Sequence, residues 1–375
     1  MTNTITKLDQ PFSKNTGLIP HTAFNSLDTR AKLEYFCLLG HLAPSSHNTQ
    51  PWRFGINETN SVITVYLNRK FILPASDVDG RQATVSIGCA TENIETAAQY
   101  YGYKAHTTIT CTDKTAVKPT AENSDGLIEI LRIKFTTSEP QLNLESKTRA
   151  IFTRKIVRAE YDPTRPIPNE VLHVIQDLAD KNITELHPIT DSIRRLTIAE
   201  FQAQADAYVI NSPKFSRELG DWLLPNNDGG YLGMTGITFG LQDDEALRLH
   251  NGLSGKSSLQ PEDGLKFAAG GKIFIEKSPL IGIITTKKDD VENWVMAGKL
   301  FEKIFLELTT KGIQIAVHAG ITEVPLVKKI FGITIGTTRH ITVLFRAGYI
   351  KKPEDLLRPY SSRLPLEQVV VTDRS

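Results

Sequence analysis

The sequence predicts an α+β fold, because segments with helical periodicity and segments with strand alternation are mixed along its 375 residues. A chain of this length buries substantial apolar surface and suggests two domains, or one large domain with internal duplication. Lys and Arg (43) nearly balance Asp and Glu (42), which gives a formal charge of +1. Because no global field then favours nucleic acid or an anionic membrane, we expect neither as a partner, and any anion site should be local.

Cysteine usage and the polar N-terminus indicate a cytoplasmic, non-secreted protein. Cys37, Cys89 and Cys111 have no metal-ligand spacing, and an odd number of cysteines argues against a disulfide scaffold. No run approaches the roughly 18 apolar residues needed to cross a bilayer. The nine histidines are scattered, and neither His-Glu-x-x-His nor Gly-x-Ser-x-Gly occurs, so no metal site or nucleophile motif is expected.

The first half of the chain is predicted to follow an N-terminal arm over 1–24, which has Pro, Asn, Ser and Thr without periodicity. Alternation of Val62, Thr64 and Tyr66 with their neighbours is typical of a strand. The predicted elements are a helix over 25–40, a strand over 61–68, a helix over 82–101, and strands over 104–111 and 128–135.

A domain boundary is predicted near the Pro-rich stretch 162–168, which gives halves over 25–145 and 146–375. The Gly- and Asn-rich segment near 225–260 has few periodic signals and is predicted to be a mobile loop or lid. The other elements predicted here are a helix that starts at Asn169, a strand over 280–286, a helix over 291–311, and a strand over 340–346.

Two glycine clusters are weak candidates for nucleotide binding. The segment 252–257 ends like a P-loop, but His250 stands where the first glycine belongs and no strand precedes it. The cluster 229–233 lacks the strand-turn-helix context of a dinucleotide fold. Both are therefore interpreted as flexible loop.

The segment 43–54 places small hydroxyls, an amide, two prolines and an indole directly after a predicted helix. One interpretation is a helix-terminating turn, which Pro51 extends and Trp52 anchors in the core. The other is a donor-rich platform, in which Ser45, Ser46 and Asn48 surround a planar heteroaromatic ring. The residues alone leave both open.

The string from Pro44 to Trp52 resembles the P-S-S-x-N-x-Q-P-W motif of the nitroreductase family at every fixed position. In that family the turn contacts the ring of FMN across a dimer interface. The resemblance therefore implies that Pro44, Ser45, Ser46 and Asn48 bind FMN. His47, inside the same turn, is a candidate proton donor.

The family also has a basic run that binds the FMN phosphate near the start of each subunit, and this chain has a similar run only at 153–158. Several cations around one point suit a phosphate, although a solvated basic patch beside a linker is the alternative. The resemblance extends to 317–323 and to the C-terminal segment 358–367. The further cofactor-binding candidates are Arg154, Lys155, Ile156, Arg158, Val317, His318, Ala319, Gly320, Ser361 and Arg363.

The turn motif occurs only in the first half and the basic run only in the second. This arrangement resembles the Acg-like branch of the nitroreductase family, whose members mimic a dimer in one chain. The resemblance spans roughly 30–370, is weakest over 190–275, and implies two helix-flanked, mostly antiparallel sheets with one FMN at their interface.

The implied activity is reduction of nitroaromatics or quinones by NADH or NADPH, in a monomeric pseudo-dimer or a homodimer whose other partners are small molecules. The alternative is a protein that stores or sequesters FMN with little turnover.

Overall fold

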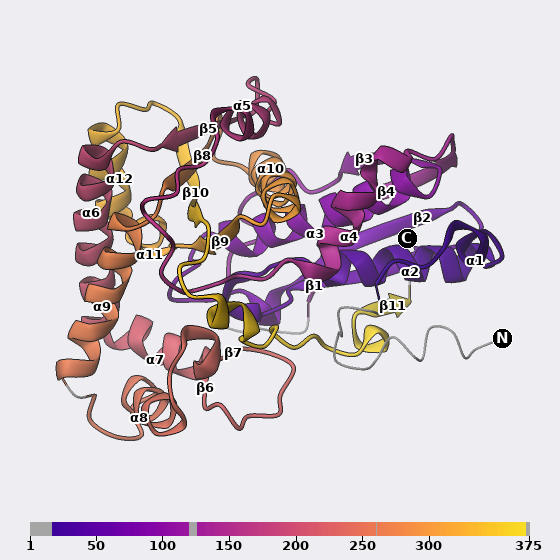
Figure 1. Cartoon of the computed structure of the whole chain (residues 1–375). Coiled ribbons are helices and arrows are strands. Elements are labelled where there is room, and N and C mark those ends of the chain that lie inside the picture. The colour runs from indigo at the N-terminus through magenta and orange to yellow at the C-terminus, as the bar shows by residue number, and fades with distance from the viewer. Residues whose placement is uncertain (1–16, 120–125, 260, 373–375) are drawn as a thin grey trace.

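The computed structural model describes residues 17–119, 126–259 and 261–372. Most of the predicted N-terminal arm lies outside this range, and the described part begins with the short helix α1 (His21–Asn25). Two larger sheets lie on either side of a pair of long helices, α3 (Arg81–Tyr100) and α10 (Val291–Thr310), as Figure 1 shows. Helices and mostly antiparallel strands are mixed along the chain, so the predicted α+β class is confirmed.

The first sheet has the order β11-β1-β2-β4-β3. Its neighbouring strands are antiparallel, except that β11 joins β1 in parallel and brings the C-terminal segment into the sheet of the first half. The strands are β1 (Trp52–Asn57), β2 (Val62–Asn68), β3 (Tyr103–Ile109), β4 (Leu127–Thr137) and β11 (Val370–Thr372).

Helix α2 (Thr29–His41) packs on this sheet and leads into the motif turn. The predicted start at residue 25 was too early, because the Asp28 carboxylate accepts a hydrogen bond from Ala31 N and caps the helix there. Helix α4 (Glu145–Thr153) arises in a segment whose polar composition predicted no helix. It ends where the basic run begins.

The second sheet is antiparallel throughout, in the order β5-β8-β10-β9. Strand β8 is buried along its whole length, as its apolar sequence predicts. The strands are β5 (Thr184–Ile189), β8 (Leu280–Thr286), β9 (Gln314–Val317) and β10 (His340–Gly348). The accompanying helices are α5 (Asn169–Asp177), α6 (Ser192–Asn211), α9 (Pro261–Glu276), α11 (Gly320–Glu323) and α12 (Pro325–Thr334).

Helices α3 and α10 approach each other at backbone contact through two glycines. A Cβ on Gly88 would lie 2.1 Å from Val295 O, and a Cβ on Gly298 would lie 2.0 Å from Val85 O. Any side chain at either position would force the helices apart. The glycines therefore fix the spacing between the two sheets and hence the width of the site described below.

The predicted lid segment is more ordered than its composition indicated. It contains the small strand β7 (Met234–Thr235), the turn η5 (Gly236–Phe239) and α8 (Asp243–Leu253). The helix α7 (Pro213–Trp222) and the small strand β6 (Leu223–Leu224) directly precede it. Gln242 and Glu245 form a capping box that starts α8, a signal missed among the glycines. Gly252 lies inside α8, which agrees with the rejection of a P-loop.

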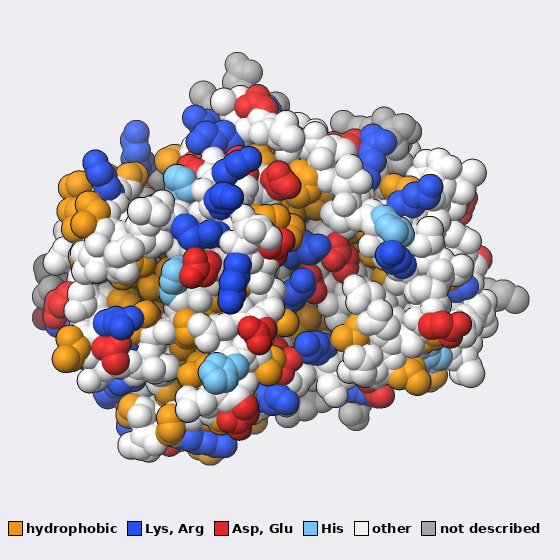
Figure 2. All heavy atoms as spheres, turned by 90° about the horizontal axis from the view of Figure 1, so that it is seen from above, with side chains coloured by type: hydrophobic (Ala, Val, Ile, Leu, Met, Phe, Trp, Pro, Cys, Tyr) orange, Lys and Arg blue, Asp and Glu red, His pale blue; other side chains and the backbone are white. Residues whose placement is uncertain are grey.

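Among the described residues, no helix is both long and apolar enough to span a bilayer, and no cluster of three or more His, Cys, Asp or Glu side chains suits a metal ion. Acidic and basic side chains are interspersed over the face shown in Figure 2.

Candidate functional site

The motif turn is fixed at its base by His41, the last residue of α2. His41 Nδ1 accepts from Trp52 Nε1 at 2.8 Å, so Nε2 has the proton and donates to Leu364 O, also at 2.8 Å. Burial, with a smaller contribution from Arg363, lowers the pKa of His41 to about 3. A neutral imidazole therefore joins the turn to the C-terminal tail.

The backbone of the turn adopts unusual conformations. His47, Asn48 and Gln50 have positive φ (49°, 57° and 51°), which is strained for residues other than glycine and often accompanies a functional site. Ser45 Oγ accepts from Gln50 N at 3.0 Å, and Ser46 Oγ donates to Gln82 Oε1 at 2.6 Å. Hydrogen bonds of the two serine hydroxyls therefore fix the turn, one within the turn itself and one to α3.

Gln50, a fixed position of the motif that was not among the predicted site residues, supports the turn from below. Its side chain is fully buried, donates from Nε2 to Tyr231 O at 2.7 Å, and accepts from Leu364 N at 2.9 Å. Asn48 likewise donates to Ser362 O at 3.0 Å and accepts from Arg363 Nη1 at 2.9 Å. These amides join the turn, the lid segment and the tail.

The basic run starts where α4 ends. Arg154 donates from Nε to Glu302 Oε1 at 2.7 Å and from Nη2 to Leu42 O, and both charged side chains are almost fully buried. Lys155 donates to Leu356 O at 2.5 Å and to Arg358 O at 2.7 Å. The run is thus bound to the body of the protein and differs from a solvated basic patch.

Arg158 points differently from its neighbours. Its guanidinium stacks over Phe239 at 4.4 Å and lies 3.3 Å from Met234 Sδ, both residues of the lid segment. Ile156, between the two arginines, forms a bridge to Ile315 of the second sheet. The side chain of Arg158 therefore reaches the space between the lid and the motif turn.

Arg363 caps the C-terminal end of α2. It donates to the carbonyl oxygens of His41, Leu42 and Ala43 at 2.9–3.1 Å, in addition to Asn48. Burial, and next Arg154, lowers the pKa of Arg363 to about 9. Much of its donor capacity is thus used within the protein, and its remaining contribution to a bound anion is its charge.

Two adjoining cavities bring every predicted site residue together. The larger one, about 440 Å³, lies in the size range of small-molecule sites. Of the predicted residues it is lined by Pro44, Ser45, Ser46, His47, Ile156, Arg158, Val317, His318, Ala319 and Gly320. The smaller one, about 60 Å³, is lined by Pro44, Ser45, Asn48, Arg154, Lys155, Ile156, Arg158, Ser361 and Arg363.

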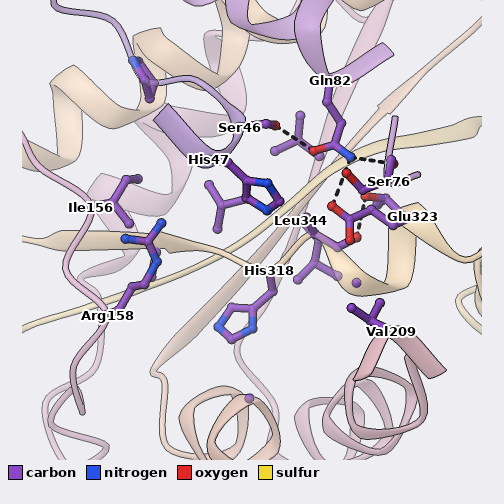
Figure 3. A pocket seen from close by; sticks show the side chains of 18 of the residues that line it. Ser46, His47, Ser76, Gln82, Ile156, Arg158, Val209, His318, Glu323 and Leu344 are labelled. Carbon is purple, nitrogen blue, oxygen red and sulfur yellow. Dashed lines mark hydrogen bonds between the residues drawn. The ribbon is translucent and has the colours of Figure 1, made fainter. Parts of the chain in front are cut away.

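The larger cavity has a basic end and an acidic end, visible in Figure 3. Arg158 and His318 lie on one side. On the other, Gln82 donates to Glu323 Oε1 at 3.0 Å and to Ser76 O at 2.9 Å. His47 lies between the two groups.

The acidic end holds protons near neutral pH. Burial raises the pKa of Glu323 to about 7 and that of Asp206 to about 8, and the nearby Glu323 carboxylate adds to the shift of Asp206. Asp206 lies against the backbone, since a Cβ on Gly271 would meet its Oδ2 at 2.2 Å. Asp206 is therefore largely protonated at pH 7, inside the cavity.

His47, beside the basic end of the cavity, is neutral near pH 7. Burial, followed by the charge of Arg158, lowers the pKa of His47 to about 4, and His47 Nδ1 has no hydrogen-bond partner among the described residues. The imidazole that was a candidate proton donor therefore has no dissociable imidazolium proton at neutral pH.

Sequence reasoning missed many residues of the larger cavity, among them Arg346, Gln82 and Asp206. Arg346 is fully buried on β10, and a charge inside an otherwise apolar strand was the signal that would have revealed it. Gln82 lies at the start of a predicted helix and was noted only for periodicity. Asp206 lies on α6, in the part of the chain with the least informative sequence, and no pattern marked it.

Comparison with known proteins gives partial similarities. No family model matches the chain. It is 26% identical over 191 residues to two uncharacterized proteins of Mycobacterium tuberculosis, Rv3127 of strain H37Rv and MT3212 of strain CDC 1551, and the match covers 50% of this chain and 52% of each relative. The chain thus spans about half the length of the curated relatives it matches.

Similar solved structures include three nitroreductases. The FMN-dependent nitroreductase NfnB from Mycobacterium smegmatis, in complex with NADPH, has 16% identity and a TM-score of 0.42, and the match covers 61% of this chain and 99% of that one. The FMN and NADPH-dependent NfnB from Sphigopyxis sp. strain HMH has 15% identity and a TM-score of 0.39, with the same coverage. A nitroreductase with bound FMN from Desulfitobacterium hafniense has 13% identity and a TM-score of 0.37, again over 61% and 99%.

Proposed function

We propose that this protein is an FMN-binding oxidoreductase of the nitroreductase type, with one FMN site per chain built from both halves. The observation that carries the proposal is the meeting of three distant segments, 44–48, 154–158 and 361–363, around one pair of adjoining cavities. The motif that resembles the nitroreductase turn therefore lies beside the basic run that resembles its phosphate site.

The smaller cavity suits a phosphate group. Arg154, Lys155 and Arg363 surround it, and neither Arg158 nor Arg363 forms an ion pair with any carboxylate in the described part of the chain. Half-buried cations without acidic partners favour an anionic ligand, because the anion offsets the cost of their partial desolvation. Ser45 and Ser361 add hydroxyl donors.

The larger cavity suits the isoalloxazine ring. Ile156, Leu344 and Phe301 give it apolar walls, and the motif-turn residues 44–46 line it as well. FMN, when bound, supplies the hydride chemistry between a nicotinamide donor and a nitroaromatic or quinone acceptor. Arg158 would place positive charge beside the ring, and Asp206 or Glu323 would hold the proton that a reduced acceptor takes up.

A second candidate function is FMN storage, and the contacts of the lid segment favour it. Tyr231 O accepts from Gln50, and Phe239 and Met234 both touch Arg158. A lid held at three points beside the site would retain the cofactor and hinder access by a nicotinamide.

Anaerobic mixing of the FMN-loaded protein with NADPH and with NADH separates the two functions. A reductase bleaches the flavin absorbance near neutral pH, and subsequent addition of a quinone restores it. A storage protein remains yellow with both donors. Protein that neither contains FMN nor takes it up on reconstitution would refute both proposals.

A further inference from the structure

Arg346 is a buried cation that the proposed cofactor site does not use. It lies on β10 with 1% of its surface exposed and lines the larger cavity, but not the smaller one. Its guanidinium stacks between the rings of Tyr161 and Phe274, at 4.2 and 4.7 Å from their centroids. A charge buried this deeply needs an opposite charge or a full set of hydrogen bonds.

Arg346 has neither among the described residues. Its Nε donates to His318 Nε2 at 2.9 Å, but its buried Nη1 has no hydrogen-bond partner, and no described carboxylate forms an ion pair with it. Tyr161, the nearby hydroxyl, donates instead to Val157 O at 2.9 Å. At least one strong donor of a residue that lines the cavity is therefore left without a partner among the described residues.

Arg158 lines the same cavity and adds a second cation. Burial, and then the charge of Arg346, lowers the pKa of Arg158 to about 10. His318 accepts from Arg346 at Nε2, so its proton lies on Nδ1, and burial together with both arginines lowers its pKa and keeps it neutral. The basic end therefore has two positive charges with no ion-pair partner among the described residues.

The acidic groups of the cavity have other partners. Glu218 accepts from Ser76 Oγ at 2.6 Å, Glu323 from Gln82 at 3.0 Å, and Asp206 from Gln202 Nε2 at 2.7 Å. None of the three is within ion-pair distance of Arg158 or Arg346. The positive charge at the basic end is therefore left for an anion from outside the described residues.

We infer that Arg346, Arg158 and His318 form an anion subsite that binds the carboxylate or phosphate group of a small aromatic molecule. Arg346 would donate from Nη1, which lacks a partner, and Arg158 would add charge from the lid side. Phe274, Leu344 and Phe301 would contact the aromatic part. That this molecule is the electron acceptor rests on the proposed function. Its binding to the subsite can be measured whether or not the protein is a reductase.

Binding of three matched probes, measured by isothermal titration calorimetry on the protein as purified, tests the subsite. The probes are 4-nitrobenzoate, 4-nitrophenyl phosphate and the neutral 4-nitrobenzamide. We expect at least one anion to bind about tenfold or more tightly than the amide, as a charge-assisted bond predicts. The tighter anion identifies the preferred head group, and equal binding of all three probes would overturn the inference.

Arg346→Gln should remove this preference, whereas Arg165→Gln should keep it. Arg165 is a matched control, because it is an exposed arginine that stacks on Tyr349 outside the cavity. Circular dichroism checks that each variant folds, and if Arg346→Gln does not, Arg346→Met, which removes the charge but fills a similar volume, provides the same comparison. An undiminished preference in the folded variant would overturn the inference.

FMN content, measured in the same samples, separates this inference from the proposed function. Protein that takes up no FMN on reconstitution but still prefers the anions would refute the FMN proposal and leave the subsite standing. If Arg346→Gln lost FMN but kept the anion preference, Arg346 would belong to the cofactor and the inference would fail.

Discussion

Glu302→Gln tests how the basic run is held in place. Glu302 Oε1 accepts from Arg154 Nε at 2.7 Å, and the two side chains are 0% and 3% exposed. Burial raises the pKa of Glu302 despite the adjacent arginine, so desolvation outweighs the attraction within the pair. The variant keeps the shape and one acceptor oxygen but leaves Arg154 as an uncompensated buried charge.

Breaking a buried pair from one side costs about 3–5 kcal/mol, and the retained acceptor places the expected loss near the lower end of that range. Urea denaturation of the FMN-free protein measures it, with an unchanged m-value as evidence that only stability has changed. Glu145→Gln is the control, because its pair with Arg149 is about half-exposed and should contribute no more than about 0.5 kcal/mol.

Added FMN should recover part of the loss in Glu302→Gln, because a phosphate beside Arg154 would replace the missing carboxylate charge. The stabilisation by FMN should therefore be larger in the variant than in the unmodified protein. A loss below about 1 kcal/mol, or an FMN effect equal in both proteins, would refute the reasoning.

Three further predictions concern the FMN site, the acidic end and the central helices. Arg158→Gln should weaken FMN binding about 10- to 150-fold in equilibrium dialysis, as loss of one charge-assisted bond predicts, whereas unchanged affinity would exclude Arg158 from the site. The folded pKa of Asp206 is raised from 3.8 to about 8, so its contribution to stability is full at low pH and is lost as the pH rises towards 8. Asp206→Asn should remove this pH dependence of the unfolding free energy in urea titrations between pH 5 and 9. An unchanged profile would contradict the raised pKa. Gly88→Ala should lower the free energy of unfolding by about 1–3 kcal/mol or more, because the added methyl group pushes α10 away. Gly270→Ala, with no atom within 4 Å of its added Cβ, should be neutral or stabilising. Similar effects of both substitutions would refute the close contact of the helices.

Local patterns predicted much of the fold. The strand over 280–286 and the helix near 291–311 occur almost as predicted, because a continuous apolar run and an apolar stripe each leave one low-energy structure. The lid segment was harder, because its glycines obscured the capping box of α8. The parallel addition of β11 to the first sheet depends on contacts more than 300 residues apart in the sequence, which no local pattern contains.

The candidate site also contains residues that local sequence patterns predicted and residues that only the tertiary fold brings together. The motif turn and the basic run are contiguous strings, so sequence reasoning named their residues, and the structure brings these residues to the same cavities. Gln82, Asp206 and Arg346 come from three different elements and belong to the cavity only through the tertiary fold. The sequence also gave no indication that Arg363 and Asn48 would bind each other, which changes Asn48 from a free donor into a support for the tail.

The number of FMN molecules per chain tests the central claim most directly. Quantifying flavin released from protein of known concentration, after saturation with FMN and removal of the excess, gives this number. A composite site built once from the two halves predicts a ratio close to one. A ratio close to two, or no retained flavin, would contradict the account.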